Sequence, residues 1–158
     1  MKTLIVYGTK HGSAEKCCKL LKNKISGEVI TINIKIENVP DLSTFDNVII
    51  GGSIYAGQIQ KEIKNFCLKN IETLKSKRVG LFICGLSGDK FEEQLNNAFP
   101  KELASCAIAK EFFGGEFIFK NANFLEKFIM KKIAKTDKDS SNLLEENISK
   151  LAKSMGNR

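Results

Sequence analysis

Three apolar runs in this chain stop abruptly at loops made of glycine and small polar residues. "TLIVYG" ends at Gly8, "NVIIGGSIYAG" breaks at Gly51, and "RVGLFICGLSGD" stops at Gly85. A short continuous apolar run bounded by turn residues is typical of a strand that is buried on both faces. Helical patterns lie between the runs, and this alternation favours a parallel sheet covered by helices on both sides.

The alternation extends over the whole chain. We expect strands within residues 3–8, 28–34, 47–55, 78–85 and 107–119, and helices over about 13–26, 59–74, 89–99, 123–134 and 141–155. Gly27 is expected to end the first helix and Pro100 the third. No internal repeat or linker interrupts the pattern. The sequence therefore predicts an α/β fold with a doubly wound five-stranded parallel sheet, in a single domain over residues 1–158.

The first loop, residues 9–14, has the composition of a phosphate-binding turn. In a doubly wound sheet the ligand lies outside the carboxyl ends of the strands, where the strand order reverses. There, backbone N–H groups and the positive end of the following helix attract a phosphate. The candidate residues are Thr9, Lys10, His11, Gly12, Ser13 and Ala14. The alternative is that Ser13 only caps the helix and that His11 is an exposed loop residue.

Two further loops are expected at the same edge of the sheet and could enclose a planar ring. Their candidate residues are Ser53, Ile54, Tyr55, Ala56, Gly57, Cys84, Gly85, Leu86, Ser87 and Gly88. Glycines let backbone amides approach the edge of a ring, and Tyr55 can stack on its face. The alternatives are plain turn chemistry for the glycines, a half-buried surface aromatic for Tyr55 and a packing role for Cys84. Neither G-x-G-x-x-G nor the P-loop motif occurs, which favours a mononucleotide over NAD or ATP.

The composition is that of an ordinary globular chain, with 42% hydrophobic and 27% charged residues. Five cysteines without a C-x-x-C pair favour free, mostly buried thiols in a reducing compartment, so we expect a cytoplasmic protein. A single histidine and the absence of a Cys/His cluster argue against a metal site. No apolar run approaches the ~18 residues of a membrane span, and no signal peptide is expected.

The net charge of +7 allows a nucleic acid, an anionic membrane surface or an acidic protein as partner. No nucleic-acid-binding motif occurs, so no nucleic-acid partner is expected. The segment "NFLEKFIMKKIAK", residues 123–135, reads as a basic amphipathic helix, which can lie on an anionic membrane. Its apolar and basic residues are Phe124, Phe128, Ile129, Lys127, Lys131, Lys132 and Lys135. The alternative is a core helix with a solvated lysine face.

Taken together, the loops resemble those of a known family. "TKHGSA" resembles the phosphate loop of flavodoxins, and "GGSIYAG" and "CGLSGD" resemble their two flavin-contacting loops, in the same order and spacing. "KTLIVYGTKHGSAEK", "VIIGGSIYAG" and "FLEKFIMKKIAKTD" are similar to the flavodoxin-domain branch that includes menaquinone-dependent protoporphyrinogen oxidases. A response-regulator receiver domain, the rival with this element order, would need an acidic pair after the first strand, which "YGTKHG" lacks.

The resemblance implies FMN as cofactor, with its phosphate on Thr9 and residues 11–14 and its ring between loops 53–57 and 84–88. It implies a redox protein that relays electrons to partner proteins without catalytic side chains. The alternative is an oxidase-type enzyme that passes hydrogen from a porphyrinogen to a quinone, so enzyme activity stays open. In that case the 123–135 segment would allow a peripheral membrane location. A scaffold without flavin is the third alternative.

Overall fold

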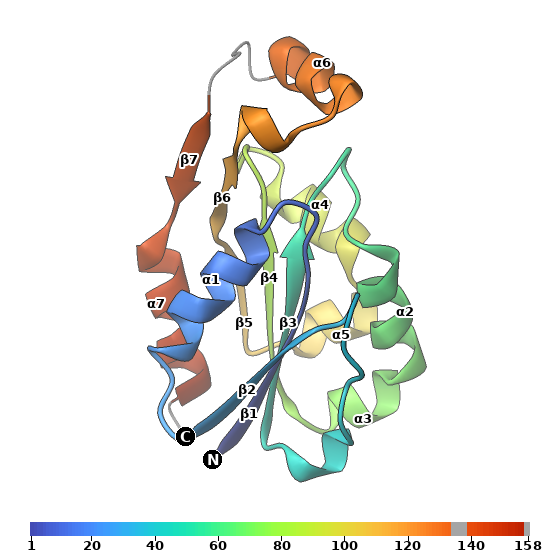
Figure 1. Ribbon diagram of the computed structural model, residues 1–158. Coiled ribbons are helices and arrows are strands. Elements are labelled where there is room, and N and C mark those ends of the chain that lie inside the picture. Colours follow the sequence, from blue (N-terminus) through green and yellow to red (C-terminus); the bar gives the residue numbers. More distant parts are fainter. Residues whose placement is uncertain (134–138, 157–158) are drawn as a thin grey trace.

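A sheet of five parallel strands runs through the centre of the computed structural model, which describes residues 1–133 and 139–156 (Figure 1). The strands are β1 (Lys2–Gly8), β2 (Glu28–Asn33), β3 (Asn47–Ser53), β4 (Arg78–Cys84) and β5 (Ala109–Phe112). Their order across the sheet is β2-β1-β3-β4-β5, and every neighbouring pair is parallel. The predicted α/β fold with a doubly wound five-stranded parallel sheet is confirmed.

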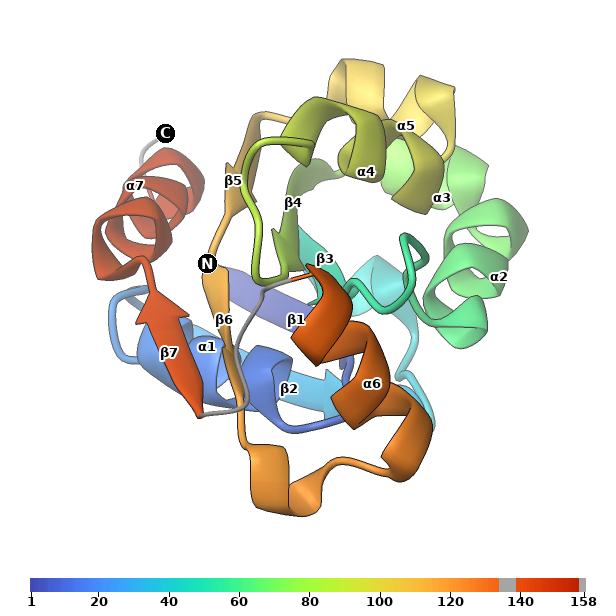
Figure 2. The ribbon, with the colours of Figure 1, turned by 90° about the horizontal axis from the view of Figure 1, so that it is seen from above.

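Helices cover both faces of this sheet, as the view along the strands shows (Figure 2). One face carries the helices α1 (Ser13–Lys22) and α7 (Glu145–Gly156). The other face carries four helices, α2 (Lys61–Lys69), α3 (Ile71–Lys75), α4 (Phe91–Ala98) and α5 (Lys101–Cys106). A short 3-10 helix, η1 (Leu42–Thr44), precedes β3. Alternate strand residues belong to separate cores: Leu4 and Val6 pack with the α2 side, and Ile5 with the α1 and α7 side. Both faces are buried, which explains the unbroken apolar runs.

The ends of the central strands lie level with one another. Gly8 at the end of β1 pairs with Gly52 of β3, and Ser53 pairs with Cys84 at the end of β4. Connections from β1 and β3 leave toward opposite faces, so the strand order reverses between them. Such a reversal opens a crevice at the carboxyl ends of the strands, which is where ligands bind in this class of fold.

An insertion after β5 extends the molecule beyond these carboxyl ends. It contains β6 (Gly114–Phe117), the 3-10 helix η2 (Phe119–Asn121), α6 (Phe124–Ile133) and β7 (Ser140–Leu143). β6 and β7 pair antiparallel in a sheet of their own, and Figures 1 and 2 show α6 beyond the ends of β1, β3 and β4. The predicted start of the last helix at Ser141 is therefore wrong, because α7 begins at Glu145. Residues 140–143 form a strand because the distant backbone of residues 114–117 supplies their hydrogen bonds.

Two other expected boundaries are also corrected. α1 ends at Lys22, and Gly27 instead takes φ +92° in the turn before β2, where a side chain would collide with Met1. The helix expected over 59–74 is two helices, α2 and α3, which are separated at Asn70, whose φ of −112° and ψ of 17° depart from helical values. The predicted stop before Pro100 is confirmed, because α4 ends at Ala98, and Pro100 is also the N-cap residue of α5. Ala134 and Lys135 of the basic segment lie outside the described residues.

Candidate functional site

A pocket of about 340 Å³ lies at the carboxyl ends of β1, β3 and β4, between the three loops and under the insertion. Of the predicted site residues it is lined by Lys10, His11, Ser13, Ser53, Ile54, Tyr55, Ala56, Gly57, Cys84, Gly85, Leu86 and Ser87. The predicted residues that do not line it are Thr9, Gly12, Ala14 and Gly88. The tertiary structure thus brings the three loops together at one cavity. That these residues bind a cofactor stays a prediction.

Sequence reasoning missed the lining residues that come from α4, β6 and α6. They are Gln94, Gly115, Glu116, Phe117, Glu126 and Met130. Only one of them carried a local signal: Glu126 follows Asn123 by three residues, the spacing of a helix capping box. That spacing predicts where a helix begins, but not that the helix lies over a pocket.

The 9–14 loop is a tight turn that leads straight into α1. The Thr9 Oγ1 accepts a hydrogen bond from the Gly12 N–H at 2.9 Å, and Gly12 adopts φ +89°, a conformation that favours glycine. The Ser13 hydroxyl donates to the Glu116 carbonyl and accepts from the Glu116 N–H, both at 3.0 Å. The single hydroxyl proton of Ser13 therefore already has a partner, and the backbone N–H groups of the first turn of α1 are the main-chain donors that this turn can offer to an anion.

Lys10 and His11 of this loop share one buried carboxylate. Lys10 Nζ lies 2.6 Å from Glu126 Oε1, and His11 Nε2 lies 3.3 Å from Glu126 Oε2. The Glu126 side chain is 2% exposed, and its carboxylate also accepts from the Asn123 N–H at 3.1 Å. Burial alone would raise the pKa of Glu126, but the hydrogen bonds from Lys10 and Asn123 and the His11 charge outweigh it and hold this pKa below its usual range.

The 53–57 loop presents Tyr55 to the pocket from a tight turn. Tyr55 and Gln58 exchange backbone hydrogen bonds of 2.9 and 3.0 Å, and the residues between them, Ala56 and Gly57, have φ values of +48° and +75°. Positive φ at both central residues is the mark of a type I′ turn. Lys10 Nζ lies 3.7 Å from the centre of the Tyr55 ring, so the cation contacts one face of the aromatic side chain.

The loop after β4 is held by the first residues of the insertion. The Gly85 N–H donates to the Gly114 carbonyl at 2.9 Å, and a side chain at Gly115 would lie 2.9 Å from the Gly85 carbonyl oxygen. β6 thus passes so close to this loop that Gly115 has no room for a larger residue. Cys84 at the base of the pocket is fully buried, and a hydrogen bond with Cys17 together with burial raises the pKa of its thiol. The packing role expected for Cys84 agrees with this neutral, buried thiol.

Two buried polar atoms on the lining have no hydrogen-bond partner among the described residues. They are the Ser53 Oγ and the Gln94 Oε1. A buried polar atom without a partner costs about 1–3 kcal/mol, so such atoms at a pocket point to a ligand with polar groups on its edge. The pocket thus offers cations and amides at one end, an aromatic face at Tyr55, and unsatisfied polar atoms along its wall.

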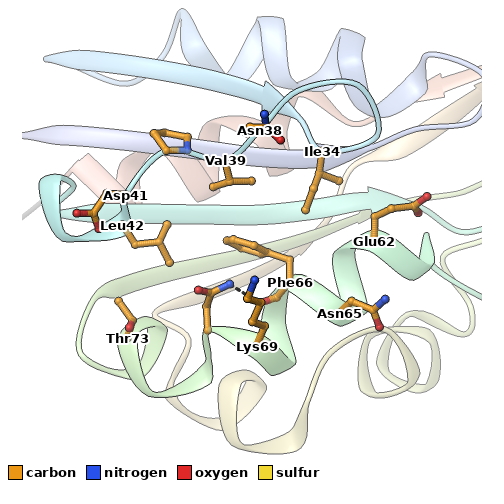
Figure 3. Close-up of a pocket in the computed structure, with 12 residues that line it drawn as sticks. Ile34, Asn38, Val39, Asp41, Leu42, Glu62, Asn65, Phe66, Lys69 and Thr73 are labelled. Atoms are coloured by element: carbon orange, nitrogen blue, oxygen red, sulfur yellow. Dashed lines mark hydrogen bonds between the residues drawn. The ribbon is translucent and has the colours of Figure 1, made fainter.

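A larger hollow, of about 630 Å³, lies elsewhere on the molecule, between the β2–β3 connection and helices α2 and α3 (Figure 3). Figure 3 shows its apolar side chains Val39, Leu42 and Phe66 turned toward one another, with Glu62 and Asn65 at one end. It contains none of the predicted site residues and lies away from the ends of β1, β3 and β4. We therefore assign the site to the smaller pocket, where the chemistry of the three loops converges.

The described residues contain no helix long and apolar enough to cross a membrane. Within the same residues no group of His, Cys, Asp and Glu side chains could hold a metal ion. Four of the five cysteines are buried free thiols, and Cys106 is exposed.

Comparison with known proteins points to one family. The family model described as "Flavodoxin domain" matches residues 4–143. A flavodoxin of Streptococcus pneumonia TIGR4 is 15% identical with a TM-score of 0.60, and covers 98% of this chain and 97% of its own. A short-chain flavodoxin associated with a non-canonical PDU bacterial microcompartment is 16% identical with a TM-score of 0.61, over 98% of this chain and 96% of its own. No curated protein matches the chain by sequence.

A longer protein contains the same fold as one part. Rubredoxin:oxygen oxidoreductase from Desulfovibrio gigas is 15% identical with a TM-score of 0.58, over 98% of this chain but only 35% of its own length. The chain therefore spans about a third of that protein. At these identities the structural likenesses show the fold, while the family match rests on the sequence itself.

Proposed function

The chain belongs to the flavodoxin domain family, and from this premise we propose that it is an electron-transfer protein that binds FMN in the pocket at the ends of β1, β3 and β4. The observation that carries the proposal is the convergence of three separate loops on one cavity. One loop supplies cations and free amides, the second an aromatic face, and the third a buried thiol and small residues. A flat ring with a phosphate tail needs this combination of surfaces.

The residues present fit FMN in charge, shape and hydrogen bonding. Amides of the first turn of α1, with Lys10 and His11, would hold the phosphate. Tyr55 would lie against the ring, and the unpartnered Ser53 Oγ and Gln94 Oε1 would bond polar groups on its edge. The Ser53 Oγ and the Gln94 Oε1 have no other partner among the described residues, whereas Lys10 and His11 contact the Glu126 carboxylate.

Bound flavin would supply the redox chemistry, since it accepts and gives up one or two electrons. The chain's own residues would orient the ring and set its surroundings. The turn at Ala56 and Gly57 would offer a backbone carbonyl or N–H to the ring edge, and the neutral Cys84 thiol would add no charge. The electron-relay function therefore requires no acid–base side chain.

The redox partners are proposed to be proteins with an acidic docking surface. The chain carries a net charge of +7, and α6, beside the pocket, contributes Lys127, Lys131 and Lys132. Opposite charges on two proteins speed their encounter and orient the complex, while like charges suppress it. Proximity of this basic helix to the pocket would bring an acidic partner close to the flavin.

We expect the purified chain to quench the fluorescence of FMN in a saturable titration, because the ring would be stacked on Tyr55 and removed from water. Chemical reduction followed by air oxidation should restore the starting spectrum over repeated cycles. ATP at the same concentration should not compete, since the sequence lacks the P-loop. An FMN titration without quenching or a visible spectral change would contradict the proposal.

A second candidate is an oxidase that passes hydrogen from a porphyrinogen to a quinone at a membrane surface. The observation that favours it is α6, where Phe124, Leu125 and Phe128 are exposed beside lysines near the pocket. Apolar side chains flanked by lysines suit an anionic bilayer. The FMN-loaded chain should then oxidise protoporphyrinogen with menaquinone and co-sediment with anionic liposomes at low salt. Activity no higher than free FMN, without sedimentation, would leave the electron-relay function alone.

A further inference from the structure

The buried carboxylate of Glu126 contacts the 9–14 loop, which is proposed to hold the phosphate. The contacts at 2.6 Å to Lys10 and 3.3 Å to His11 join α6 to residues more than a hundred positions earlier in the chain. Carboxylates and phosphates are both oxyanions that bind the same cationic donors through charge-assisted hydrogen bonds. In this structure the Glu126 carboxylate therefore uses two of the side chains that a phosphate would need.

Few of the α6 side chains whose burial the structure describes are buried. Among the α6 side chains whose burial is described, only Glu126 and Met130 are buried. The exposed fractions of Phe124, Leu125 and Phe128 are 88%, 60% and 53%. Since hydrophobic stabilisation scales with the apolar area removed from water, Phe124, Leu125 and Phe128 gain little from the present position of α6. Among the described side chains of α6, the charged contact at Glu126 and the buried Met130 join the helix to the pocket.

The Glu126 carboxylate and a bound phosphate cannot both occupy this end of the pocket without a cost in free energy. A phosphate beside an undisplaced Glu126 would bring like charges together in a poorly solvated pocket, where Coulomb repulsion is stronger than in water. The carboxylate must leave, or the phosphate must bind more weakly. A ligand with the same ring but no phosphate meets no such conflict.

We propose that the Glu126 carboxylate occupies the phosphate end of the pocket in the ligand-free chain, and that a phosphate-bearing ligand binds by displacing it together with α6. This inference rests on the proposed function, in which FMN is that ligand. Riboflavin, which carries the same ring without phosphate, leaves the contact with Lys10 and His11 in place. Glu126 thus sets the ratio of affinities for the phosphorylated and unphosphorylated flavins.

Replacing Glu126 by glutamine tests the displacement directly. Glu126→Gln keeps the size of the side chain and an acceptor for the Asn123 N–H, but removes the charge that competes with phosphate. We expect FMN to bind about 10-fold more tightly, the scale of one charge-assisted hydrogen bond, with riboflavin affinity unchanged. Fluorescence titration of the wild-type and variant chains with both flavins measures the ratio.

Glu72→Gln is the matched control. It removes the same charge from an exposed pair with Lys75 at 3.3 Å on α3, away from the pocket, so neither affinity should change. Weaker FMN binding by Glu126→Gln would show that Glu126 instead positions Lys10 for the phosphate, and would overturn displacement. An equal gain for FMN and riboflavin would also overturn it, because the effect would not depend on phosphate.

Hydrogen exchange of the wild-type chain tests the movement of α6 without any variant. Backbone amides of residues 124–133 should exchange faster with FMN bound than with riboflavin bound, and slower exchange with FMN would overturn the proposal. If the wild-type chain binds neither flavin, the proposed function fails, and inorganic phosphate alone then tests the displacement. Phosphate should speed exchange in α6, whereas unchanged exchange at saturating phosphate would overturn the displacement itself.

Discussion

Replacing Gly51 by alanine is expected to lower the free energy of unfolding by about 3 kcal/mol, the upper end of the usual cost of overpacking a core. The added methyl group would overlap the ring of Phe82, which is the direct neighbour of Gly51 on β4. Phe82 cannot move aside, because it is fully buried and stacks on Phe113 with ring centres 4.6 Å apart. Urea denaturation followed by circular dichroism measures the change.

The control for this substitution is Gly156→Ala near the end of α7. A methyl group there meets no atom within 4 Å, so the same change in side chain should cost nothing. If Gly51→Ala were as stable as Gly156→Ala, the rings of Phe82 and Phe113 would not be fixed as the structure has them. Gly51, which breaks the second of the three apolar runs, would then not be required for the packing below the site.

Replacing Tyr55 by alanine is expected to weaken the binding of FMN and of riboflavin alike, by about 10- to 100-fold. One stacked ring contributes about 1–3 kcal/mol when an aromatic side chain covers the face of a planar group. The effect should be equal for both ligands because Tyr55 contacts the ring and not the phosphate. Titration of both flavins against the wild-type and variant chains measures it.

Tyr55→Phe keeps the ring and removes only the hydroxyl, so it should bind both flavins as the wild-type chain does. A loss confined to FMN in Tyr55→Ala would mean that Tyr55 acts through Lys10, whose Nζ lies 3.7 Å from the ring centre. No loss for either ligand would place the flavin ring elsewhere. Tyr55→Ala should lower the affinity for both flavins, whereas Glu126→Gln should raise the affinity for FMN alone. Together the two variants distinguish the two ends of the pocket.

Local pattern was enough to predict the elements that position the site. The unbroken apolar runs that end at Gly8, Gly51 and Gly85 predict strands buried on both faces, and β1, β3 and β4 are such strands. Alternation with helices predicts their parallel order. Because parallel strands place their carboxyl ends at one edge of the sheet, the three loops were expected together, and they line one pocket.

Local pattern failed where a segment takes its structure from a distant partner. Residues 140–143, with the sequence SSNL, carry no strand pattern, yet they pair with residues 114–117. The position of Ser13 in the sequence predicts a phosphate contact, but its hydroxyl donates a hydrogen bond to the backbone carbonyl of Glu116. Neither partner can be identified from the residues beside it in the chain.

By itself, then, the sequence determined the sheet, its two covering layers and the edge where the loops meet, since the period of apolar residues and the position of glycines are local properties. Only the tertiary structure decided what closes that edge. After Gly114 the chain returns to the pocket, where Glu116 forms a hydrogen bond with Ser13 and the Glu126 carboxylate contacts Lys10 and His11. These contacts depend on charge and hydrogen bonding between segments far apart in the chain. The spacing of apolar residues along the sequence does not predict such contacts.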